Sequence, residues 1–280
     1  MKIDIIADIE VSSGDKIVYT KPKIKKIDVL KYYEDVSELM LPYLDKRLLS
    51  VIRCHQGVSD ACFFKKHPTT ETQNIEVFND NEDEYFYVKN KKQLVYQAQM
   101  GTIEFHTWGS QVPNIDKPNM MVFDLDPDTK LSLPKLRQGV LHLKSVLDEL
   151  GLVSFLKTSG GKGYHIVIPF SSCKNWNIFN NFANQVAELM QSKFPKLYTT
   201  NIRKNQREGK IFIDWLRNSK GATCVAPYSL RARDGACISW PIEWDDLEII
   251  KPNKVNIRNY KKYIKNNPWP NFFEIKQGLK

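Results

Sequence analysis

The segment Met121-Val-Phe-Asp-Leu-Asp-Pro127 is the most informative stretch of this sequence. Its apolar character predicts a buried central strand, and side chains two residues apart in a strand point to the same face. Asp124 and Asp126 therefore project together with Val122, whereas Met121, Phe123 and Leu125 face the other side. Pro127 is expected to end the strand, because proline has no N–H to donate to a neighbouring strand.

Two carboxylates side by side repel each other unless a cation lies between them or one takes up a proton. Hard oxygen ligands of this kind suit Mg²⁺ or Mn²⁺. A third acid, Asp214, lies in the apolar segment Lys210-Ile-Phe-Ile-Asp-Trp-Leu216, where an unpaired carboxylate is costly. The three acids predict a two-metal site for phosphoryl transfer. The alternatives are an exposed acidic turn for Asp124 and Asp126, and for Asp214 either a cap at the end of its strand or an ion pair with Arg217.

The segment Thr158-Ser-Gly-Gly-Lys-Gly-Tyr-His165 joins two predicted strands. Glycines let the backbone approach an anion closely and aim N–H groups at it. Ser159, Lys162 and His165 add a hydroxyl, a charge and a ring donor, so we predict a phosphate-binding loop. It lacks the Walker A pattern and no helix follows it. A plain hairpin turn is the alternative.

Arg231 and Arg233 stand two residues apart, and in an extended segment both guanidinium groups would reach a triphosphate from the same side. His106, on a predicted strand, is a further candidate contact for the triphosphate. The alternatives are a solvated basic loop and a structural histidine.

Lysines cluster near the N-terminus, and Arg53, Phe63-Phe64 and Lys65-Lys66 follow. Aromatic side chains beside basic ones favour stacking on bases while the charges hold the backbone. A solvated lysine-rich face and core phenylalanines are the competing interpretations. The lysines are Lys16, Lys21, Lys23, Lys25 and Lys26.

The composition is that of a globular protein with a polyanionic partner. The 280 residues carry 41 Lys+Arg against 32 Asp+Glu, a net charge of +9. No apolar run is long enough to cross a membrane, and Met1-Lys2-Ile3-Asp4 does not resemble a signal peptide, so we expect a cytosolic protein. The five cysteines show no C-x-x-C pair, which predicts buried free thiols and no zinc site.

Alternating strands and helices predict an α/β or α+β fold, as one compact unit or two joined lobes. Residues 3–19 read as strand-turn-strand with the turn at Ser12-Ser13-Gly14. Further strands are expected at residues 48–53, 84–88, 102–108, 120–125, 152–157, 164–169 and 210–216. Helices are expected at residues 28–44 with Asp28 as N-cap, and at 91–100, 133–150 and 176–194.

Together these motifs resemble the polymerase domain of bacterial and archaeal ligase D, the non-homologous end-joining branch of the archaeo-eukaryotic primase superfamily. The resemblance runs from about residue 15 to about residue 247. It is carried by Asp15-Lys-Ile-Val-Tyr19, Phe63-Phe64, His106-Thr-Trp-Gly-Ser110, Val122-Phe-Asp-Leu-Asp-Pro127, Ser159-Gly-Gly-Lys-Gly-Tyr-His165, Phe212-Ile-Asp214, Ala226-Pro-Tyr-Ser-Leu-Arg-Ala-Arg233 and Trp244-Asp-Asp-Leu247.

The resemblance implies a primase-type α/β core, with an RRM-like catalytic sheet flanked by helices and a second packed sheet. It implies one domain over residues 1–280: a DNA-end-binding part at about 1–100, a catalytic core at about 101–250 and a tail at 251–280. It further implies a template-dependent nucleotidyltransferase that prefers ribonucleotides, extends 3′ ends and fills short gaps at 5′-phosphorylated breaks. Ku and an ATP-dependent DNA ligase would be its partners, near the nucleoid, with two molecules able to meet across a break.

The same resemblance assigns a role to each candidate residue. Asp124, Asp126 and Asp214 would bind two Mn²⁺ or Mg²⁺ ions. The nucleoside triphosphate would be held by His106, Ser159, Lys162, His165, Arg231 and Arg233. Lys16, Lys26 and Arg53 would grip the 5′-phosphate of the DNA, with Phe63 and Phe64 stacking at that end.

Three other functions fit parts of the pattern. A non-catalytic DNA-end-bridging module would have no need to gather three mutually repelling acids. A two-metal nuclease would share the acids but would not need two arginines and a glycine-rich loop for a triphosphate. A replicative primase differs by starting chains without a primer, which the sequence does not distinguish from gap filling.

Overall fold

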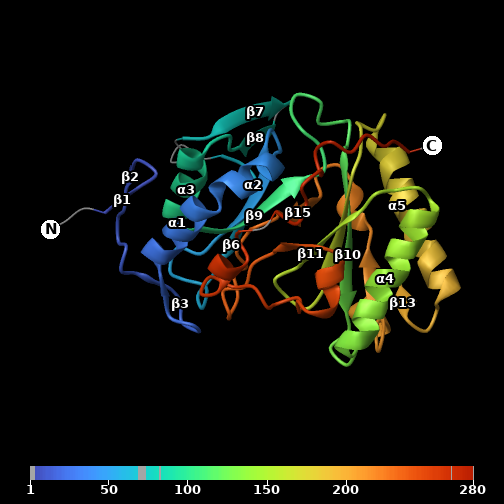
Figure 1. Ribbon diagram of the computed structural model, residues 1–280. Helices are drawn as coiled ribbons and strands as arrows, with labels where there is room; N and C mark the ends of the chain where they lie inside the picture. The colour runs from blue at the N-terminus through green and yellow to red at the C-terminus, as the bar shows by residue number, and fades with distance from the viewer. Residues whose placement is uncertain (1–3, 69–73, 82, 266, 280) are drawn as a thin grey trace.

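The computed structural model describes residues 4–68, 74–81, 83–265 and 267–279. At its centre lies a six-stranded sheet in which β10 pairs antiparallel with both β12 and β14 (Figure 1). This confirms the buried strand expected around Asp124. The strand order is β13 (Tyr198–Thr199), β14 (Ile211–Asp214), β10 (Met120–Pro127), β12 (Tyr164–Pro169), β11 (Phe155–Thr158) and β16 (Pro241–Ile242).

Two long helices, α4 (Leu133–Glu149) and α5 (Trp176–Lys193), lie together against this sheet (Figure 1). Both are amphipathic and bury one apolar stripe, as their sequence periodicity predicts. Pro134 lies in the first turn of α4, and Asn175 caps α5 by accepting a bond from the Ile178 N–H at 3.0 Å.

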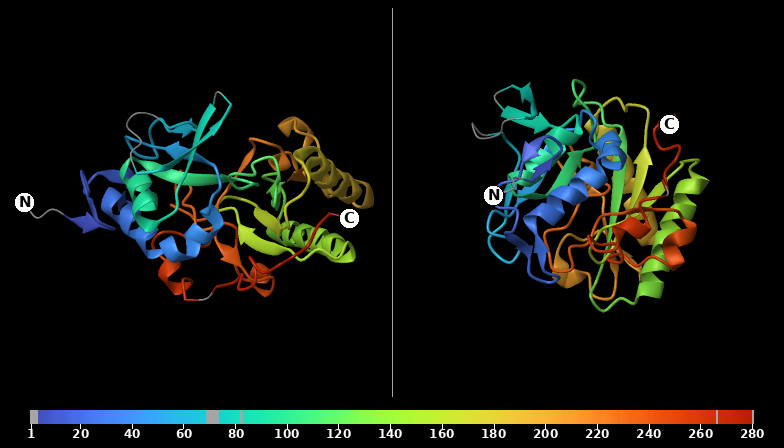
Figure 2. Two further views of the ribbon diagram at one scale, coloured as in Figure 1. Left: turned by 90° about the horizontal axis from the view of Figure 1, so that it is seen from above. Right: turned by 60° about the vertical axis from the view of Figure 1, so that its left-hand side comes forward.

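A second sheet, formed mostly by the N-terminal half of the chain, lies next to the first one (Figure 2). Its strand order is β15 (Thr223–Val225), β9 (Thr102–Trp108), β5 (Leu49–Arg53) and β6 (Phe63–Lys65). One hydrophobic cluster runs continuously through both sheets, from Phe105 to Ile166. The mixed α/β fold with a second packed sheet is therefore confirmed.

The other elements of the N-terminal half are short. They are β1 (Ile5–Ile6), β2 (Ile9–Glu10), β3 (Ile17–Tyr19), β4 (Ile24–Lys25), β7 (Glu76–Asp80), β8 (Asp83–Tyr87), α1 (Lys26–Asp35), α2 (Ser37–Leu44) and α3 (Lys91–Gln99). In the tail, the Trp269 ring is buried and its Nε1 donates to the Leu156 carbonyl at 3.0 Å. The tail is thus part of the core.

Two predictions for the N-terminal elements were wrong. The expected helix at residues 28–44 is two helices that break at Val36, and Asp28 is the third residue of α1 rather than its cap. The Asp28 carboxylate accepts the Lys25 N–H at 2.9 Å, as in a capping box. The first hairpin turns at Ala7 and Asp8, both with positive φ, not at Ser12 to Gly14. The hydrophobic spacing continues through the helix break and through the turn, so the sequence pattern does not show where either one occurs.

The expectation of five free, buried thiols was also wrong. Cys54 and Cys62 form a disulfide, whereas Cys173, Cys224 and Cys237 are free and Cys173 is only partly buried. The pairing of β5 with β6 places Arg53 opposite Phe63, so the next residue on each strand end meets its partner. Cys54 and Cys62 are separated by 8 residues, which is not the spacing of a C-x-x-C metal or redox motif. The bridge forms because strand pairing brings the two cysteines together.

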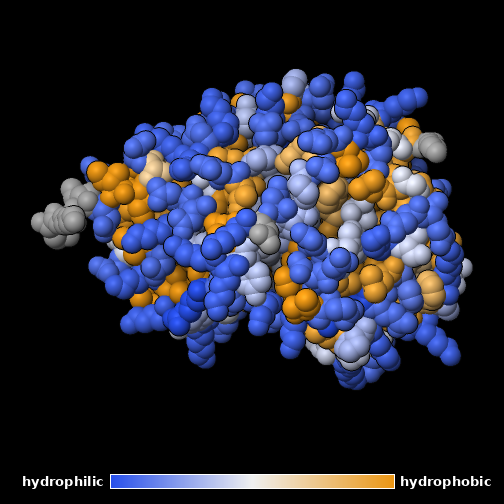
Figure 3. Space-filling model, viewed as in Figure 1, coloured by the Kyte–Doolittle hydropathy of each residue, from blue (hydrophilic) through white to orange (hydrophobic). Residues whose placement is uncertain are grey.

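Polar and charged side chains cover most of the face seen in Figure 3, and the apolar residues there form small scattered patches. Within the part of the chain that the structure describes, no helix has the length and apolar character needed to cross a membrane.

Candidate active site

Sheet register brings the three predicted acids together. Asp124 on β10 lies directly opposite Asp214 on β14 and opposite His165 on β12. Asp126 projects from the same face as Asp124, two residues further along β10. Asp124 and Asp214 are 90 positions apart in the sequence, but the pairing of β10 with β14 places them next to each other on the sheet.

Each acid already has a basic neighbour. His165 Nε2 lies 3.3 Å from Asp124 Oδ1, and Arg217 Nε lies 3.0 Å from Asp214 Oδ2. Arg207 is more distant from Asp126, with 3.7 Å between Nη1 and Oδ2. The ion pair of Asp214 with Arg217 is the alternative that the sequence left open, and the structure contains it.

The three carboxyl groups differ in charge preference. Burial opposes ionisation of Asp124, but the neighbouring His165 ring and its hydrogen bond, with the charges of Arg217 and Lys157, hold the pKa of Asp124 well below its usual range. Burial raises the pKa of Asp126, and the neighbouring Asp124 charge raises it further. Burial also raises the pKa of Asp214, with Arg217 acting against it. An added cation would relieve the penalties on Asp126 and Asp214.

The chemistry of these residues fits a hard divalent cation. Their donors are carboxylate oxygens, and Asp214 Oδ1 is buried without a hydrogen-bond partner. Over the described ranges, however, no three carboxylate, histidine or cysteine side chains converge on one ion as they stand. His165, Arg207 and Arg217 are the present ion-pair partners of these acids. The metal site remains a prediction.

A cleft of about 220 Å³ opens beside the acids. It gathers all six residues predicted to hold the triphosphate, from both sheets and the loops between them. They are His106, Ser159, Lys162, His165, Arg231 and Arg233, with Asp124 and Asp126 on its floor and Arg217 and Cys224 also on its walls.

The glycine-rich loop is held in shape by its own serine. Ser159 Oγ accepts the N–H groups of Gly161 at 3.1 Å and Gly163 at 3.2 Å. At Gly163, an added Cβ would lie 2.0 Å from the Leu125 carbonyl oxygen, so the loop approaches β10 closely. The loop therefore needs glycine there to place Lys162 beside the acids.

Replacing Gly163 by Ala tests this close approach. The Cβ cannot fit against a backbone oxygen, so the loop must move away from β10, and we expect a loss of stability of about 2 kcal/mol. Urea unfolding measures it. Gly209→Ala is less informative because that glycine has positive φ, whereas Gly278→Ala, with no atom within 4 Å of its Cβ, is the matched control and should be neutral. Equal stability for Gly163→Ala would contradict the packing described.

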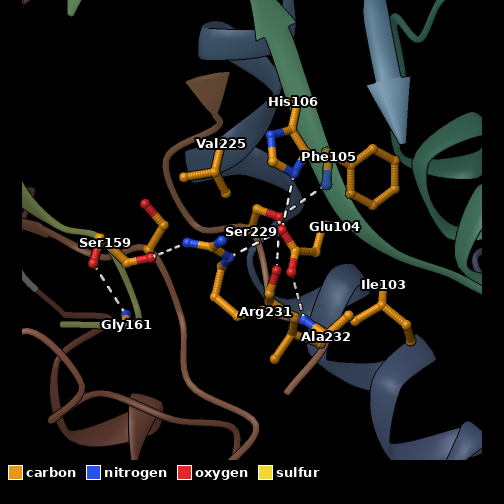
Figure 4. A network of polar contacts seen from close by, with 12 residues as sticks. Ile103, Glu104, Phe105, His106, Ser159, Gly161, Val225, Ser229, Arg231 and Ala232 are labelled. Atoms are coloured by element: carbon orange, nitrogen blue, oxygen red, sulfur yellow. Dashed lines mark hydrogen bonds and ion pairs between the residues drawn. The ribbon is translucent and has the colours of Figure 1, made fainter. Parts of the chain in front are cut away.

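Glu104 on β9 is the site residue that we did not predict. Its Oε2 lies 2.9 Å from His106 Nε2 and 3.0 Å from Arg231 Nε, and its Oε1 accepts the Ala232 N–H at 2.7 Å (Figure 4). Arg231 also donates to the Ser159 carbonyl. Glu104 thus links the second sheet to the phosphate loop. The signal for it was an acid in an otherwise apolar strand, on the same face as His106.

Electrostatics agree with this linking role. Burial opposes ionisation of Glu104, but the His106 hydrogen bond and the Arg231 charge lower its pKa to about 2. Burial lowers the pKa of His106, against the pull of Glu104. Arg233 and Arg231 both line the cleft, and the Arg233 N–H donates to the Arg231 carbonyl at 2.9 Å. A turn, and not an extended segment, brings the two guanidinium groups to the same side.

A second cleft of about 250 Å³ contains Lys16 and Lys26. Lys16 Nζ donates to the His55 carbonyl and to Gln56 Oε1, and Lys26 Nζ donates to the Ser12 carbonyl at 2.9 Å. Burial lowers the pKa of Lys26, and the charge of Lys16 lowers it further. Two ammonium groups held near each other in a partly buried cleft favour a multiply charged anion.

The remaining predicted DNA contacts divide in two. Arg53 is 2% exposed, lies outside the lining of either cleft, and donates to Gln97 Oε1 at 2.9 Å. Its burial gives it a structural role instead of a surface one. Phe63 and Phe64, by contrast, are 44% and 50% exposed, so they are not core residues.

The two phenylalanines point to different clefts. The Phe63 ring centroid lies 5.3 Å from that of His55, which lines the lysine cleft. The Phe64 centroid lies 6.2 Å from that of His106, which lines the acidic cleft. Strand β6 therefore presents one exposed ring to each cleft, because successive side chains on a strand face opposite ways.

The fold and the cleft define a class of protein: an α/β domain in which acids on the central sheet face a wall of arginine, lysine, histidine and serine side chains. The family model described as the LigD primase-polymerase domain matches residues 25–269. The chain belongs to this family.

Curated relatives and a solved structure support this family membership. It is 30% identical to the multifunctional non-homologous end joining protein LigD of Pseudomonas aeruginosa, over 98% of this chain and 34% of that protein. It is also 30% identical to the bifunctional LigD of Bacillus subtilis, over 86% and 39%. The chain thus spans about a third of the length of these relatives. The polymerase domain of Mycobacterium tuberculosis ligase D, solved in complex with DNA, superposes with a TM-score of 0.85 at 26% identity, covering 93% of this chain and 95% of that one.

Proposed function

We propose that this chain is a template-directed nucleotidyltransferase that extends 3′ ends and fills short gaps at 5′-phosphorylated DNA breaks during non-homologous end joining. The observation that carries the proposal is the cleft in which Asp124 and Asp126 face a wall of phosphate-binding groups. The LigD relatives, and the solved polymerase domain bound to DNA, support the same activity.

The acids would provide the reacting centre. Asp124, Asp126 and Asp214 would hold two divalent cations, Mn²⁺ or Mg²⁺, which when bound supply Lewis-acid chemistry at the 3′ oxygen and the leaving pyrophosphate. Asp214 stands directly across from Asp124, so both strands contribute ligands at one point of the sheet.

The cationic wall would hold the incoming triphosphate. Arg231 and Arg233 offer forked donors, Lys162 a compact charge, and Ser159 and the two histidines neutral donors. This arrangement neutralises the triphosphate beside the acids and orients it for attack by the primer. We further propose a preference for ribonucleotides.

The lysine cleft would receive the 5′-phosphate on the far side of the gap. Lys16 and Lys26 face it, and Phe63 lies at its edge, where a base can stack. This second anion site distinguishes an enzyme for broken ends from one that extends a free primer. Ku and an ATP-dependent ligase are the proposed partners, at the nucleoid, with two chains able to bridge a break.

The deciding experiment uses a gapped duplex with a labelled primer and a downstream 5′-phosphate. The purified chain is supplied with Mn²⁺ or Mg²⁺ and with each ribonucleotide or deoxynucleotide triphosphate. Templated extension, greater with ribonucleotides, is the expected result. Shortening of the labelled strand would show a nuclease instead, and tight binding without any change in the strand would show a DNA-end-bridging module.

The double variant Lys16→Ala/Lys26→Ala tests the 5′-phosphate cleft. We expect the Kd for a gapped duplex with a 5′-phosphate to rise about tenfold, while the Kd for the same duplex with a 5′-hydroxyl stays the same, because the lysines act on the phosphate charge. Fluorescence anisotropy at fixed salt measures both. Lys23→Ala, an exposed lysine outside the cleft, is the control. An equal loss for both duplexes would contradict a phosphate-specific role.

A further inference from the structure

Lys157 is a buried lysine with no role in the sequence-based site. It lies on β11 opposite His165 on β12 and is 1% exposed. Burying an ammonium group costs several kcal/mol, and an apolar side chain at such a position usually stabilises a fold at least as well. A lysine is therefore expected here only if the hydrogen bonds of its Nζ atom have a role.

Those partners are three acceptors. Nζ lies 2.8 Å from His165 Nδ1, 3.0 Å from the Val225 carbonyl oxygen and 2.7 Å from Ser239 Oγ. An ammonium group has three N–H donors and no acceptor. All three hydrogens of Lys157 are thus accounted for by acceptors on β12, on β15 and on the segment before β16.

The hydrogen-bond directions are fixed by these partners. The Val225 carbonyl can only accept, and Ser239 Oγ donates its hydrogen to the Thr158 carbonyl at 3.0 Å, so it accepts from Lys157. The third N–H then points at His165 Nδ1, which must offer its lone pair. The Cys224 thiol, 3.3 Å from the same nitrogen, is a second potential donor on that side.

We propose that Lys157 is a positioning residue that holds the His165 ring in the tautomer with its proton on Nε2. An imidazole whose Nδ1 accepts carries its proton on the other nitrogen. His165 Nε2 lies 3.3 Å from Asp124 Oδ1 and faces the acidic cleft. A donor, not a lone pair, is thereby aimed at the oxygen atoms in the cleft.

The tautomer matters because every expected partner of Nε2 is an acceptor. With the proton on Nδ1, the Nε2 lone pair would face the Asp124 carboxylate and repel it, and it would equally repel a phosphate oxygen. The part of this inference that concerns the triphosphate rests on the proposed function. The part that concerns the ring itself rests only on the hydrogen-bond geometry.

The test is nuclear magnetic resonance of the histidine rings in the metal-free, ¹⁵N-labelled 280-residue chain at neutral pH. Long-range ¹H–¹⁵N correlation spectra distinguish the two neutral tautomers and the doubly protonated ring. The chain has 5 histidines, and His165→Gln identifies the signals of His165. We expect the Nε2–H tautomer in the wild type. A proton on Nδ1, in either the neutral or the charged ring, would overturn the proposal without any need for a Lys157 variant.

Two variants then test the cause. Lys157→Met keeps the length of the side chain but has no donor, so His165 should shift toward a mixture of tautomers. Ser239→Ala removes another acceptor of the same ammonium group and should leave the tautomer unchanged. An unchanged ring in Lys157→Met, or an equal shift in both variants, would show that Lys157 does not set the tautomer. Thermal unfolding of each variant confirms that it is folded.

Nucleotide binding supplies an independent readout. The Kd of a non-hydrolysable nucleoside triphosphate should rise about tenfold in Lys157→Met, the effect of one lost charge-assisted hydrogen bond. DNA binding through the lysine cleft should not change. If the chain bound no triphosphate at all, the proposed function would fail while the tautomer result would still stand.

Discussion

Replacing Asp126 by Asn will abolish primer extension, with a fall in kcat of about 10³-fold or more, while the metal-free chain stays at least as stable as the wild type. A loss of that size corresponds to about 4 kcal/mol of transition-state stabilisation. Asn keeps the shape of the side chain and one oxygen ligand, but it removes the charge that a divalent cation requires. Primer extension on the gapped duplex measures the loss of activity.

The stability result follows from the pKa shift. Burial and the charge of Asp124 raise the pKa of Asp126, so its ionised form is disfavoured in the folded chain at neutral pH. A neutral side chain removes that penalty. Thermal unfolding of the wild type should show a rise in Tm with Mn²⁺ that the variant lacks.

A matched control lies two residues away. Asp128 Oδ2 accepts the Gly209 N–H at 2.8 Å, and an Asn at this position keeps an oxygen for that bond. Asp128→Asn should therefore extend primers as the wild type does. If Asp126→Asn kept its activity, or lost it only together with its folding, the assignment of Asp126 to a metal site would be wrong.

The second large effect is expected at Glu104. At pH 7 the variant Glu104→Gln should unfold with about 3 kcal/mol less free energy than the wild type, because the lowered pKa of the carboxyl corresponds to that much folding free energy. Gln keeps the shape but leaves the partly buried Arg231 guanidinium without its counter-charge. Urea unfolding at pH 7 measures the difference.

The pH dependence of this difference has a definite sign. The pKa of Glu104 falls from its ordinary value of 4.5 to about 2 in the folded chain. Its contribution is therefore fully present above pH 4.5 and is lost as the pH falls toward 2. The stability difference between wild type and variant should shrink over that interval.

Glu84→Gln, a change at an exposed glutamate, provides the control and should show no such difference. A stability loss below about 0.5 kcal/mol in Glu104→Gln, or a difference that does not change with pH, would mean that Glu104 does not link the two sheets. We also expect weaker triphosphate binding by Glu104→Gln, because Arg231 loses the group that orients it.

Much of the candidate site followed from local pattern. The alternation around Asp124 and Asp126 predicted both the strand and the shared face, and β10 confirms it. The glycine-rich segment predicted a loop between two strands, which Ser159 and Gly163 now explain. Such predictions succeed because strand geometry and glycine conformation are properties of a few consecutive residues.

Local pattern does not reveal the surroundings of other residues, because distant segments build them. Arg53 reads as a surface cation but lies under Gln97, and Cys54 meets Cys62 only because β5 pairs with β6. Glu104 and Lys157 read as ordinary charged positions in strands, yet each is buried among partners from other parts of the chain.

The sequence by itself determined the strands, most of the helices, the shared face of Asp124 and Asp126 and the glycine-rich loop, because hydrophobic period and turn chemistry act over short distances. Only the tertiary structure decided which charges face each other. Register across the sheet sets Asp124 against Asp214 and His165, and sheet packing sets Arg231 against Glu104. Ion pairs and hydrogen bonds depend on distances of a few ångströms between residues far apart in sequence, and folding alone fixes those distances.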